Sequence, residues 1–275
     1  MKKQLILVLA VVVFFVFSPW ACKLAFGAYL YGISYDFSNP QIPKGVPYLC
    51  RIDPTEGSYV SVSQTPSIHG LSYNNSDGYL YGMGSNSHGL FRIDPADGSY
   101  DVISVPGVPE VTSGLAYNTS DGHLYGTGQA EVIPWPGNGD LFSIDLTDGS
   151  YDFVSTSPGY VMGLTYNSSD GYLYGLSVLS QPYIVRIDPA DGSFTQVSAA
   201  PMGILYGLTF NSSDGYLYGI SMTPNGSLYR IDPGNGSYVL VSDNSAPNVT
   251  ALAYVPEPAT FLLFGFAAIL LRKKR

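Results

Sequence analysis

One short phrase recurs along the chain, and it constrains the fold more than any other feature. The nine residues NSSDGYLYG stand at both 167–175 and 211–219, and near copies stand at 74–82 and 118–126. Neighbouring copies are 44 or 49 residues apart. A repeat of this length is typical of solenoids and propellers, in which each copy is one supersecondary unit that packs on its neighbours. The fold is therefore predicted from the unit as a whole.

Each unit contains four segments of strand length, named A to D in chain order. In the second unit they cover residues 70–74, 79–82, 90–95 and 99–104. Asn/Ser-Asp-Gly stands between A and B, and Asp-Gly-Ser or a close variant stands between C and D. Glycine accepts positive φ and Asn or Asp tolerates it, so both junctions are predicted to be hairpin turns. Four antiparallel strands per period predict propeller blades, because ankyrin and tetratricopeptide repeats are shorter and helical.

The ends of the array fix the number of blades. The first unit begins with its B segment, Ala28-Tyr-Leu-Tyr-Gly, and the missing A segment stands at 250–254 near the C-terminus. Pairing these two segments closes a ring and leaves no open sheet edge at the junction. The sequence therefore predicts an all-β fold, a five-bladed β-propeller over residues 28–254. A glycine within the A segment of four units indicates that A is the innermost strand, where space is smallest.

The N-terminus has the features of a secretory signal peptide. Lys2 and Lys3 precede an apolar run of 13 residues at 5–17, and Ala25-Phe-Gly27 supplies small residues at the exit. We expect residues 1–27 to be removed after Gly27. The alternative is a permanent membrane helix, for which the run is short against about 30 Å of hydrocarbon. Removal leaves Cys50 as the single cysteine, expected to be a buried thiol in a strand and unable to form an intramolecular disulfide.

The C-terminus carries a second targeting pattern, residues 255–275. Pro256, Glu257 and Pro258 are followed by the apolar stretch 261–271 and a basic end, Arg272–Arg275. This tail resembles the PEP-CTERM sorting signal of exosortase-processed bacterial proteins. The resemblance implies that Pro256, Glu257 and Pro258 are recognised by an exosortase-type sorting protease, which cuts near them and releases the body to the cell surface or an exopolysaccharide matrix. Before cleavage the basic end stays cytoplasmic, giving transient anchoring in the inner membrane; the alternative is an anchor that is never processed.

Charge narrows the range of partners. Between residues 28 and 255 there are five basic and 20 acidic residues, a formal charge near −15. Nucleic acids and anionic lipids need a cationic surface, so neither is expected as a partner. A neutral polysaccharide or a cation-rich matrix is compatible with this charge. The repeats also resemble the propellers of secreted bacterial proteins that carry Tyr-Gly, Ile-Asp-Pro and Gly-Ser motifs, a group without a common activity.

No catalytic residue, metal site or cofactor site is predicted. Five-bladed glycoside hydrolases need carboxylates that converge on the axis, and the A segments carry none in their Gly-Leu-x-Tyr/Phe-Asn cores. The acids recur in turns. The stretches 94–98 and 188–192 lack the alternating ligands of a calcium loop, so turn capping is expected for Asp94. Arg92 is two residues from Asp94 on the same strand face, which predicts a local ion pair.

The irregular loops are expected on the face opposite the A–B turns. The longest, 34–46 and 128–139, bring Tyr35, Phe37 and Trp135 to one rim, where aromatic side chains on a rigid scaffold are candidate ligand anchors. The alternative is that these rings pack on their own loops. The sequence thus favours an exported, non-catalytic adhesion, matrix or carbohydrate-binding protein; the alternatives are a divergent extracellular glycoside hydrolase and a purely structural matrix protein.

Overall fold

A computed structural model describes the part of the chain between residues 28 and 256, with short gaps. The described ranges are 28–35, 45–84, 89–104, 110–129, 139–147, 150–156, 160–178, 182–199, 205–221 and 223–256. Leu30–Val255 form one compact unit, and the description below concerns that unit. The predicted signal peptide and the sorting tail from Glu257 onward lie outside the described ranges. Within those ranges no helix has the length and apolar character needed to cross a membrane.

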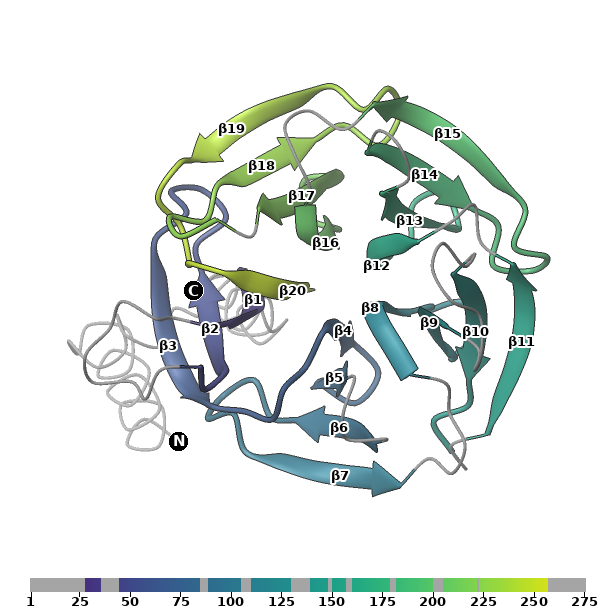
Figure 1. Ribbon diagram of the computed structural model, residues 1–275, viewed down its shortest axis with the longest axis horizontal. Coiled ribbons are helices and arrows are strands. Elements are labelled where there is room, and N and C mark those ends of the chain that lie inside the picture. The colour runs from purple at the N-terminus through teal and green to yellow at the C-terminus, as the bar shows by residue number, and fades with distance from the viewer. Residues whose placement is uncertain are drawn as a thin grey trace, which may run out of the picture. The chain divides into compact units, whose positions relative to one another are not determined.

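In the described part of the chain, twenty strands form five antiparallel sheets of four strands (Figure 1). Blade 1 contains β20 (Val249–Val255), β1 (Tyr29–Ser34), β2 (Tyr48–Ile52) and β3 (Tyr59–Gln64). Blade 2 contains β4 (Gly70–Asn74), β5 (Tyr79–Met83), β6 (Gly89–Ile93) and β7 (Tyr100–Ser104). Blade 3 contains β8 (Glu110–Tyr117), β9 (Leu124–Gln129), β10 (Asp140–Ile144) and β11 (Tyr151–Thr156). Blade 4 contains β12 (Val161–Asn167), β13 (Tyr172–Ser177), β14 (Tyr183–Ile187) and β15 (Phe194–Ala199), and blade 5 contains β16 (Leu205–Asn211), β17 (Tyr216–Ser221), β18 (Leu228–Ile231) and β19 (Tyr238–Ser242).

The five blades stand around a common axis. Figure 1 shows the A strands β20, β4, β8, β12 and β16 at the centre and the D strands β3, β7, β11, β15 and β19 at the perimeter. Each A strand contacts the A strands of the two neighbouring blades. The predicted all-β, five-bladed propeller is therefore confirmed.

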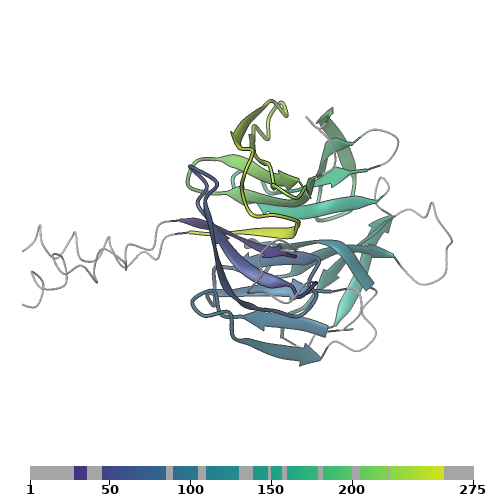
Figure 2. The same ribbon diagram turned by 60° about the vertical axis from the view of Figure 1, so that its left-hand side comes forward.

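Blade 1 is assembled from both ends of the described chain. Strand β20 lies beside β1 in the sheet, as both views show (Figure 2). The hydroxyl of Ser34 donates to the carbonyl of Pro247 at 2.6 Å, and Thr250 Oγ1 donates to the carbonyl of Ile68 at 3.1 Å. The predicted closure by a C-terminal strand is confirmed. Since β20 is the A strand and β1 the B strand, the chain enters and leaves where the other blades have their A–B turn.

Glycines allow the A strands to approach one another at the centre. A Cβ on Gly114 would lie 2.8 Å from the Cβ of Leu164 in the next blade, and one on Gly207 would lie 2.7 Å from the Cβ of Leu252. Real Cβ atoms do not come this close, so a larger residue would push the blades apart. The prediction that small residues mark the innermost strand is confirmed.

The hydrophobic core lies between blades. Tyr81 and Leu90 of blade 2 pack with Leu115, Leu124 and Ile144 of blade 3, and equivalent clusters join the next two pairs of blades. Fully burying such a side chain is worth about 1.5–3 kcal/mol. Each blade is therefore stabilised mainly by its neighbours, as a repeat architecture requires.

The repeated phrase forms the A–B turn and the first residues of strand B. In blade 3 the Asn118 Oδ1 atom accepts a hydrogen bond from the Ser120 N–H at 2.9 Å. The amide of Gly122, whose φ is 81°, donates to the Asn118 carbonyl at 2.9 Å. Asp121 Oδ1 accepts from the His123 N–H at 2.9 Å, which starts strand B. The asparagine and the aspartate of the phrase therefore each accept a hydrogen bond from a backbone amide of the turn.

The aspartate of the C–D turn also accepts a hydrogen bond from a backbone amide, and this is why the predicted ion pair between Arg92 and Asp94 is wrong. Asp94 Oδ1 accepts from the Ala96 N–H at 2.8 Å, which confirms turn capping. Arg92 does not pair with Asp94; its Nη2 atom lies 2.9 Å from Asp101 Oδ2. Asp101 stands directly opposite Arg92 on the neighbouring strand β7. Cross-strand register therefore selects the partner, while the turn occupies Asp94.

Cys50 is a buried thiol, as predicted. It is 1% exposed and donates to the carbonyl of Gly32 at 3.2 Å. Burial raises its pKa to about 12. The thiol is therefore protonated at neutral pH, and ionisation that would make it nucleophilic is suppressed.

Candidate functional site

The axis of the propeller is too narrow to hold water and is lined mainly by leucine and glycine. Its lining includes one leucine from each A strand: Leu71, Leu115, Leu164, Leu208 and Leu252. The space between them does not admit a water-sized sphere. None of the described residues that line it is an aspartate or glutamate. A buried pair of carboxylates, which glycoside hydrolysis requires, is therefore not present in this lining.

Tyr35 takes part in a short chain of polar contacts at the loop end of the axis. Its hydroxyl lies 2.7 Å from Ser67 Oγ, which in turn lies 3.4 Å from His69 Nε2. His69 and Tyr206 line this end of the axial space. Phe37 and Trp135 lie outside the described residues, so the shared aromatic rim stays a prediction. The Tyr35 hydroxyl thus contacts Ser67 in another loop rather than a residue of its own loop 34–46.

A cation lies on a tyrosine ring in three blades, on the side of the A–B and C–D turns. Arg92 lies 4.7 Å from the Tyr79 ring centroid, Arg186 lies 4.4 Å from that of Tyr172, and Arg230 lies 4.2 Å from that of Tyr216. Blade 1 has an arginine at the same strand position, Arg51. The four described basic residues, histidines aside, therefore stand at equivalent positions, and three of them stack on a tyrosine.

A second tyrosine stands two residues after each stacked tyrosine on strand B. Tyr81, Tyr174 and Tyr218 donate to the aspartate of the preceding A–B turn at 2.6, 2.7 and 2.8 Å. Burial raises the pKa of these hydroxyls, and the adjacent carboxylate raises it further. The tyrosine hydroxyl therefore stays protonated and acts as the donor to the aspartate.

Blade 3 departs from this arrangement at two positions. His123 stands where blades 2, 4 and 5 have the stacked tyrosine, and Ser143 stands where they have the arginine. The register is unchanged, since Ser143 lies opposite Tyr125 on β9 and opposite Asp152 on β11. In blade 2 the same register places Arg92 opposite Tyr81 and Asp101. We call His123, Tyr125, Ser143 and Asp152 the blade 3 site.

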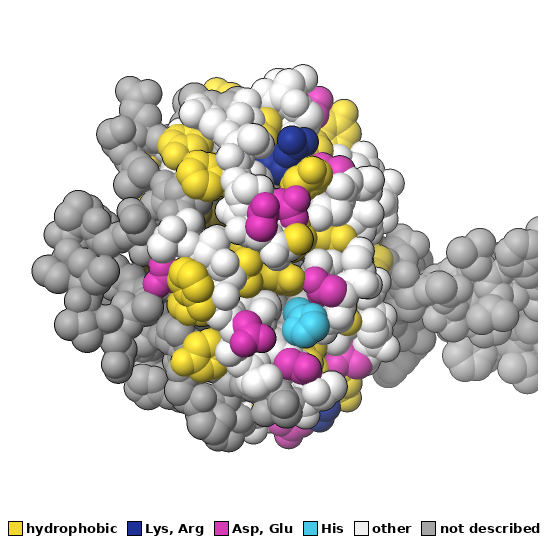
Figure 3. Space-filling view, turned by 90° about the vertical axis from the view of Figure 1, so that its right-hand side faces the viewer, with side chains coloured by type: hydrophobic (Ala, Val, Ile, Leu, Met, Phe, Trp, Pro, Cys, Tyr) yellow, Lys and Arg dark blue, Asp and Glu magenta, His cyan; other side chains and the backbone are white. Residues whose placement is uncertain are grey.

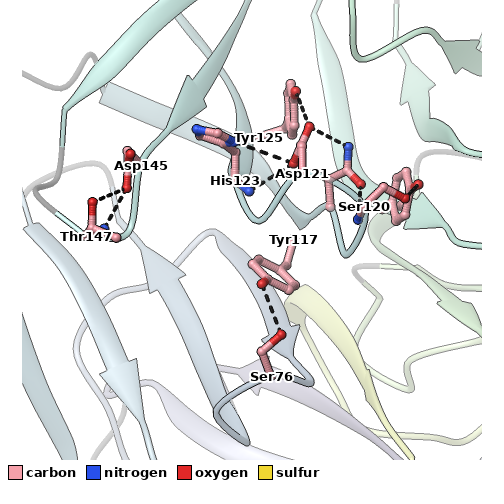
Figure 4. Close-up of polar contacts among 10 residues, drawn as sticks. Ser76, Tyr117, Ser120, Asp121, His123, Tyr125, Asp145 and Thr147 are labelled. Atoms are coloured by element: carbon pink, nitrogen blue, oxygen red, sulfur yellow. Dashed lines mark hydrogen bonds and ion pairs between the residues drawn. The ribbon is translucent and has the colours of Figure 1, made fainter.

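Fixed carboxylates lie around the blade 3 site (Figure 4). His123 Nδ1 is 3.6 Å from Asp121 Oδ1, and Figure 4 shows the imidazole between Asp121 and Asp145. Asp121 Oδ2 accepts from the Tyr125 hydroxyl at 2.8 Å, an arrangement that together with burial raises the pKa of Tyr125. Asp145 Oδ1 accepts from both the hydroxyl and the amide of Thr147, and these bonds lower the Asp145 pKa. Both carboxylates are therefore oriented by hydrogen bonds, and Asp145 is held as an anion.

Asp152 lacks the partner that its counterpart has. Asp101 pairs with Arg92 at 2.9 Å, whereas the residue opposite Asp152 is Ser143. Within the described ranges Asp152 makes no ion pair, and it is exposed on the outer strand. This site was not predicted from the sequence. The signal was present, because aligning the five C segments shows Ser143 in a column of arginines.

The other expected site residues remain predictions. Pro256 follows β20 directly and is half-buried, while Glu257 and Pro258 lie outside the described residues. Across the described ranges, no group of three or more His, Cys, Asp or Glu side chains is placed to hold a metal ion.

Comparisons with known proteins agree with the architecture. The model of a repeat of unknown function, DUF6923, matches residues 34–160. No curated protein sequence matched the chain. Among solved structures, one chain in a crystal structure of a nidogen/laminin complex aligns with a TM-score of 0.56 and 13% identity, over 82% of each chain. At this identity the likeness shows the fold alone, a β-propeller.

Proposed function

We propose that the protein is an exported, non-catalytic binding propeller, displayed at the cell surface or in an exopolysaccharide matrix as an adhesion or carbohydrate-binding component. The closed axis carries the non-catalytic part of this proposal. The axial cavity is where a propeller enzyme would gather unique carboxylates, and here the described lining contains none. Binding would then use the outer surface and the two faces.

The perimeter supports a binding role. The large hydrophobic side chains exposed in the described ranges all lie on D strands: Tyr59, Val60, Tyr100, Val102, Tyr151, Phe153, Phe194, Tyr238, Val239 and Leu240. Figure 3 shows hydrophobic side chains interspersed with acidic ones on one side of the unit. Aromatic rings beside hydrogen-bonding groups suit the apolar faces and hydroxyls of sugars.

The tail supports the delivery part of the proposal. Strand β20 ends on the face that carries the A–B turns, and Pro256 follows it at once. That face would look toward the membrane before cleavage, and the opposite loop face would point outward. Pro256, Glu257 and Pro258 would serve as recognition elements for an exosortase-type protease.

A binding and turnover screen tests the proposed activity. The exported form is incubated with a panel of polysaccharides, and both retained protein and released sugar are measured. The expected result is a stoichiometric complex without release of sugar. Release of sugar at a catalytic rate would contradict the proposal and favour the hydrolase alternative.

The intact mass of the exported form tests delivery. We expect a chain that begins at Ala28 and ends near Pro256–Pro258. Glu257→Ala should leave the chain membrane-bound with its basic end, Arg272–Arg275, while the exchange of a residue outside the motif, Thr260→Ala, should not. An exported wild-type chain that retains the basic end would contradict processing.

A further inference from the structure

The five blades offer an internal comparison, because each shows what its sequence places at the same point of the fold. In blades 2, 4 and 5 a guanidinium lies on an aromatic ring, 4.2–4.7 Å from its centroid. In blade 2 the guanidinium is also paired with a carboxylate on the outer strand, Asp101. These contacts define the chemistry that the position accepts.

Blade 3 keeps two neighbours of the guanidinium, the carboxylate of the outer strand and the inner tyrosine of strand B, and lacks the guanidinium itself. Asp152 stands in the register position of Asp101, and Tyr125 stands in that of Tyr81. An imidazole, His123, replaces the tyrosine ring, and its side chain is 40% exposed. Ser143 is a short side chain where an arginine would reach across the strand, so the position remains accessible from solvent.

We propose that the blade 3 site binds the guanidinium group of an arginine side chain supplied by a partner protein. The Asp152 carboxylate takes the role that Asp101 has toward Arg92, and the His123 ring takes the role of the stacked tyrosine. The Tyr125 hydroxyl, which donates to Asp121, bounds the site on the side of strand β9. This inference goes beyond the function proposed above and does not depend on the sorting signal or on a sugar ligand.

The chemistry favours a guanidinium over other ligands. A planar guanidinium can pair with a carboxylate and lie on a ring at the same time, whereas an ammonium acts as a compact point charge. Anions are disfavoured by Asp121, Asp145 and Asp152, and by the acidic body, which steers cations toward the surface. A metal ion is not favoured, because these acids do not form a metal-binding group in the described structure.

Titration of the exported form with blocked amino acids tests the proposal. The probe is N-acetyl-arginine amide, and the comparison compounds are N-acetyl-lysine amide and a glucosamine oligomer, each followed by amide chemical shifts. We expect saturable shifts confined to β9, β10 and β11 with the arginine probe, and at least threefold weaker binding of the lysine probe. Asp152→Asn should weaken arginine binding about tenfold or more.

Two further variants use the repeat itself as a control. Ser143→Arg with His123→Tyr restores the arrangement of the other blades, so the protein's own arginine should occupy the site and abolish probe binding. In blade 2, Arg92→Ser should open a second site beside Asp101 and raise the stoichiometry from one to two. Arg186→Ser in blade 4 should not, because the residue opposite Arg186 is Thr195.

The proposal is overturned if the arginine probe causes no saturable shift in blade 3, or if Asp152→Asn and the restored stack leave its binding unchanged. It is also overturned if the glucosamine oligomer binds through the same residues more tightly than arginine, since the partner would then be a polysaccharide. None of these results would alter the closed axis or the mass of the exported form, so failure here is distinct from failure of the proposed function.

Discussion

At the scale of single residues, the glycine of the C–D turn meets two separate demands. Gly192 has a φ of 69°, in the left-handed region that side chains with a Cβ rarely adopt. It also lies against strand β11 of the preceding blade, where an added Cβ would overlap the hydroxyl of Ser155. Gly215, in an A–B turn, has a φ of 79° and open space around it. Comparing substitutions at the two glycines therefore distinguishes the cost of backbone strain from the cost of crowding by a neighbouring blade.

Gly192→Ala should cost more stability than Gly215→Ala. We expect the A–B turn substitution to lower the free energy of unfolding by about 1 kcal/mol, the cost of a left-handed alanine. The C–D turn substitution should lower it by about 3 kcal/mol, because the blades must also separate. Urea denaturation of both variants measures the difference. Equal losses would show that Gly192 is not crowded by the preceding blade.

The buried tyrosines make stability depend on alkaline pH. Burial and an adjacent aspartate raise the pKa of Tyr81, Tyr125, Tyr174 and Tyr218 in the folded state. An unfolded tyrosine has a pKa of about 10, so above that pH the unfolded state loses protons that the folded state keeps. The contribution is fully present below about pH 10 and is lost as pH rises further.

We expect the free energy of unfolding to be level up to about pH 9.5 and to fall above it. Tyr174→Phe should reduce the slope by about one proton, because one such group is removed. Urea midpoints measured at intervals between pH 8 and pH 11.5 check this. A slope in Tyr174→Phe equal to that of the parent would contradict the assigned role of this hydroxyl.

Turn chemistry was predictable from single residues, and cross-strand pairing was not. Asp94 and Gly98 could be placed in a turn because their conformational preferences are local. The partner of Arg92 depends on which residue of β7 lies opposite it, and that is set by register. The contact between Ser67 and Tyr35 joins loops 32 residues apart and left no local pattern.

At the scale of strands, neighbouring blades are joined by repeated hydroxyl contacts. Ser76 Oγ lies 3.3 Å from the Tyr117 hydroxyl in the next blade, and Ser120 Oγ lies 2.6 Å from that of Tyr166. Ser169 is the equivalent serine of blade 4. In blade 5 the position of Tyr117 and Tyr166 is held by Phe210, which has no hydroxyl. The repeat therefore identifies a position where one contact is missing.

Phe210→Tyr should supply the missing contact and stabilise the protein. One added hydrogen bond is worth about 1 kcal/mol net, and the equivalent rings in blades 3 and 4 already carry the hydroxyl. Thermal and urea denaturation measure the gain. The double variant Ser169→Ala with Phe210→Tyr serves as the control, and it should lose the gain. Stabilisation that persists in the control would mean that the added hydroxyl acts elsewhere.

The order of strands followed from the repeat, but their irregularities did not. Hairpin turns at fixed spacing determine antiparallel neighbours, so the five sheets could be predicted. A register shift interrupts the pairing of strands C and D in blades 1, 3, 4 and 5, as at Leu141/Phe142. Such bulges depend on packing at the sheet edge, which alternating hydrophobicity does not encode. The blade 3 site was missed for another reason, because a consensus of the repeats hides single departures such as Ser143.

At the scale of the whole propeller, the ring depends on one strand from the end of the chain. Strand β20 supplies the A strand of blade 1 and contacts the A strands of blades 2 and 5. Leu252 and Ala253 are 2% exposed, so this strand is as buried as those in the middle of the chain. This pairing also fixes the face on which β20 ends, the one that carries the A–B turns.

Hydrogen exchange of the β20 amides tests the ring most directly. If β20 completes blade 1, the amides of Ala251 and Ala253, which point toward β1, exchange only through global unfolding, at the rate of the slowest amides in β12 and β16. The exported form should show this protection whether or not ligand is present. Exchange of β20 within seconds, while the other inner strands stay protected, would contradict closure by the C-terminal strand.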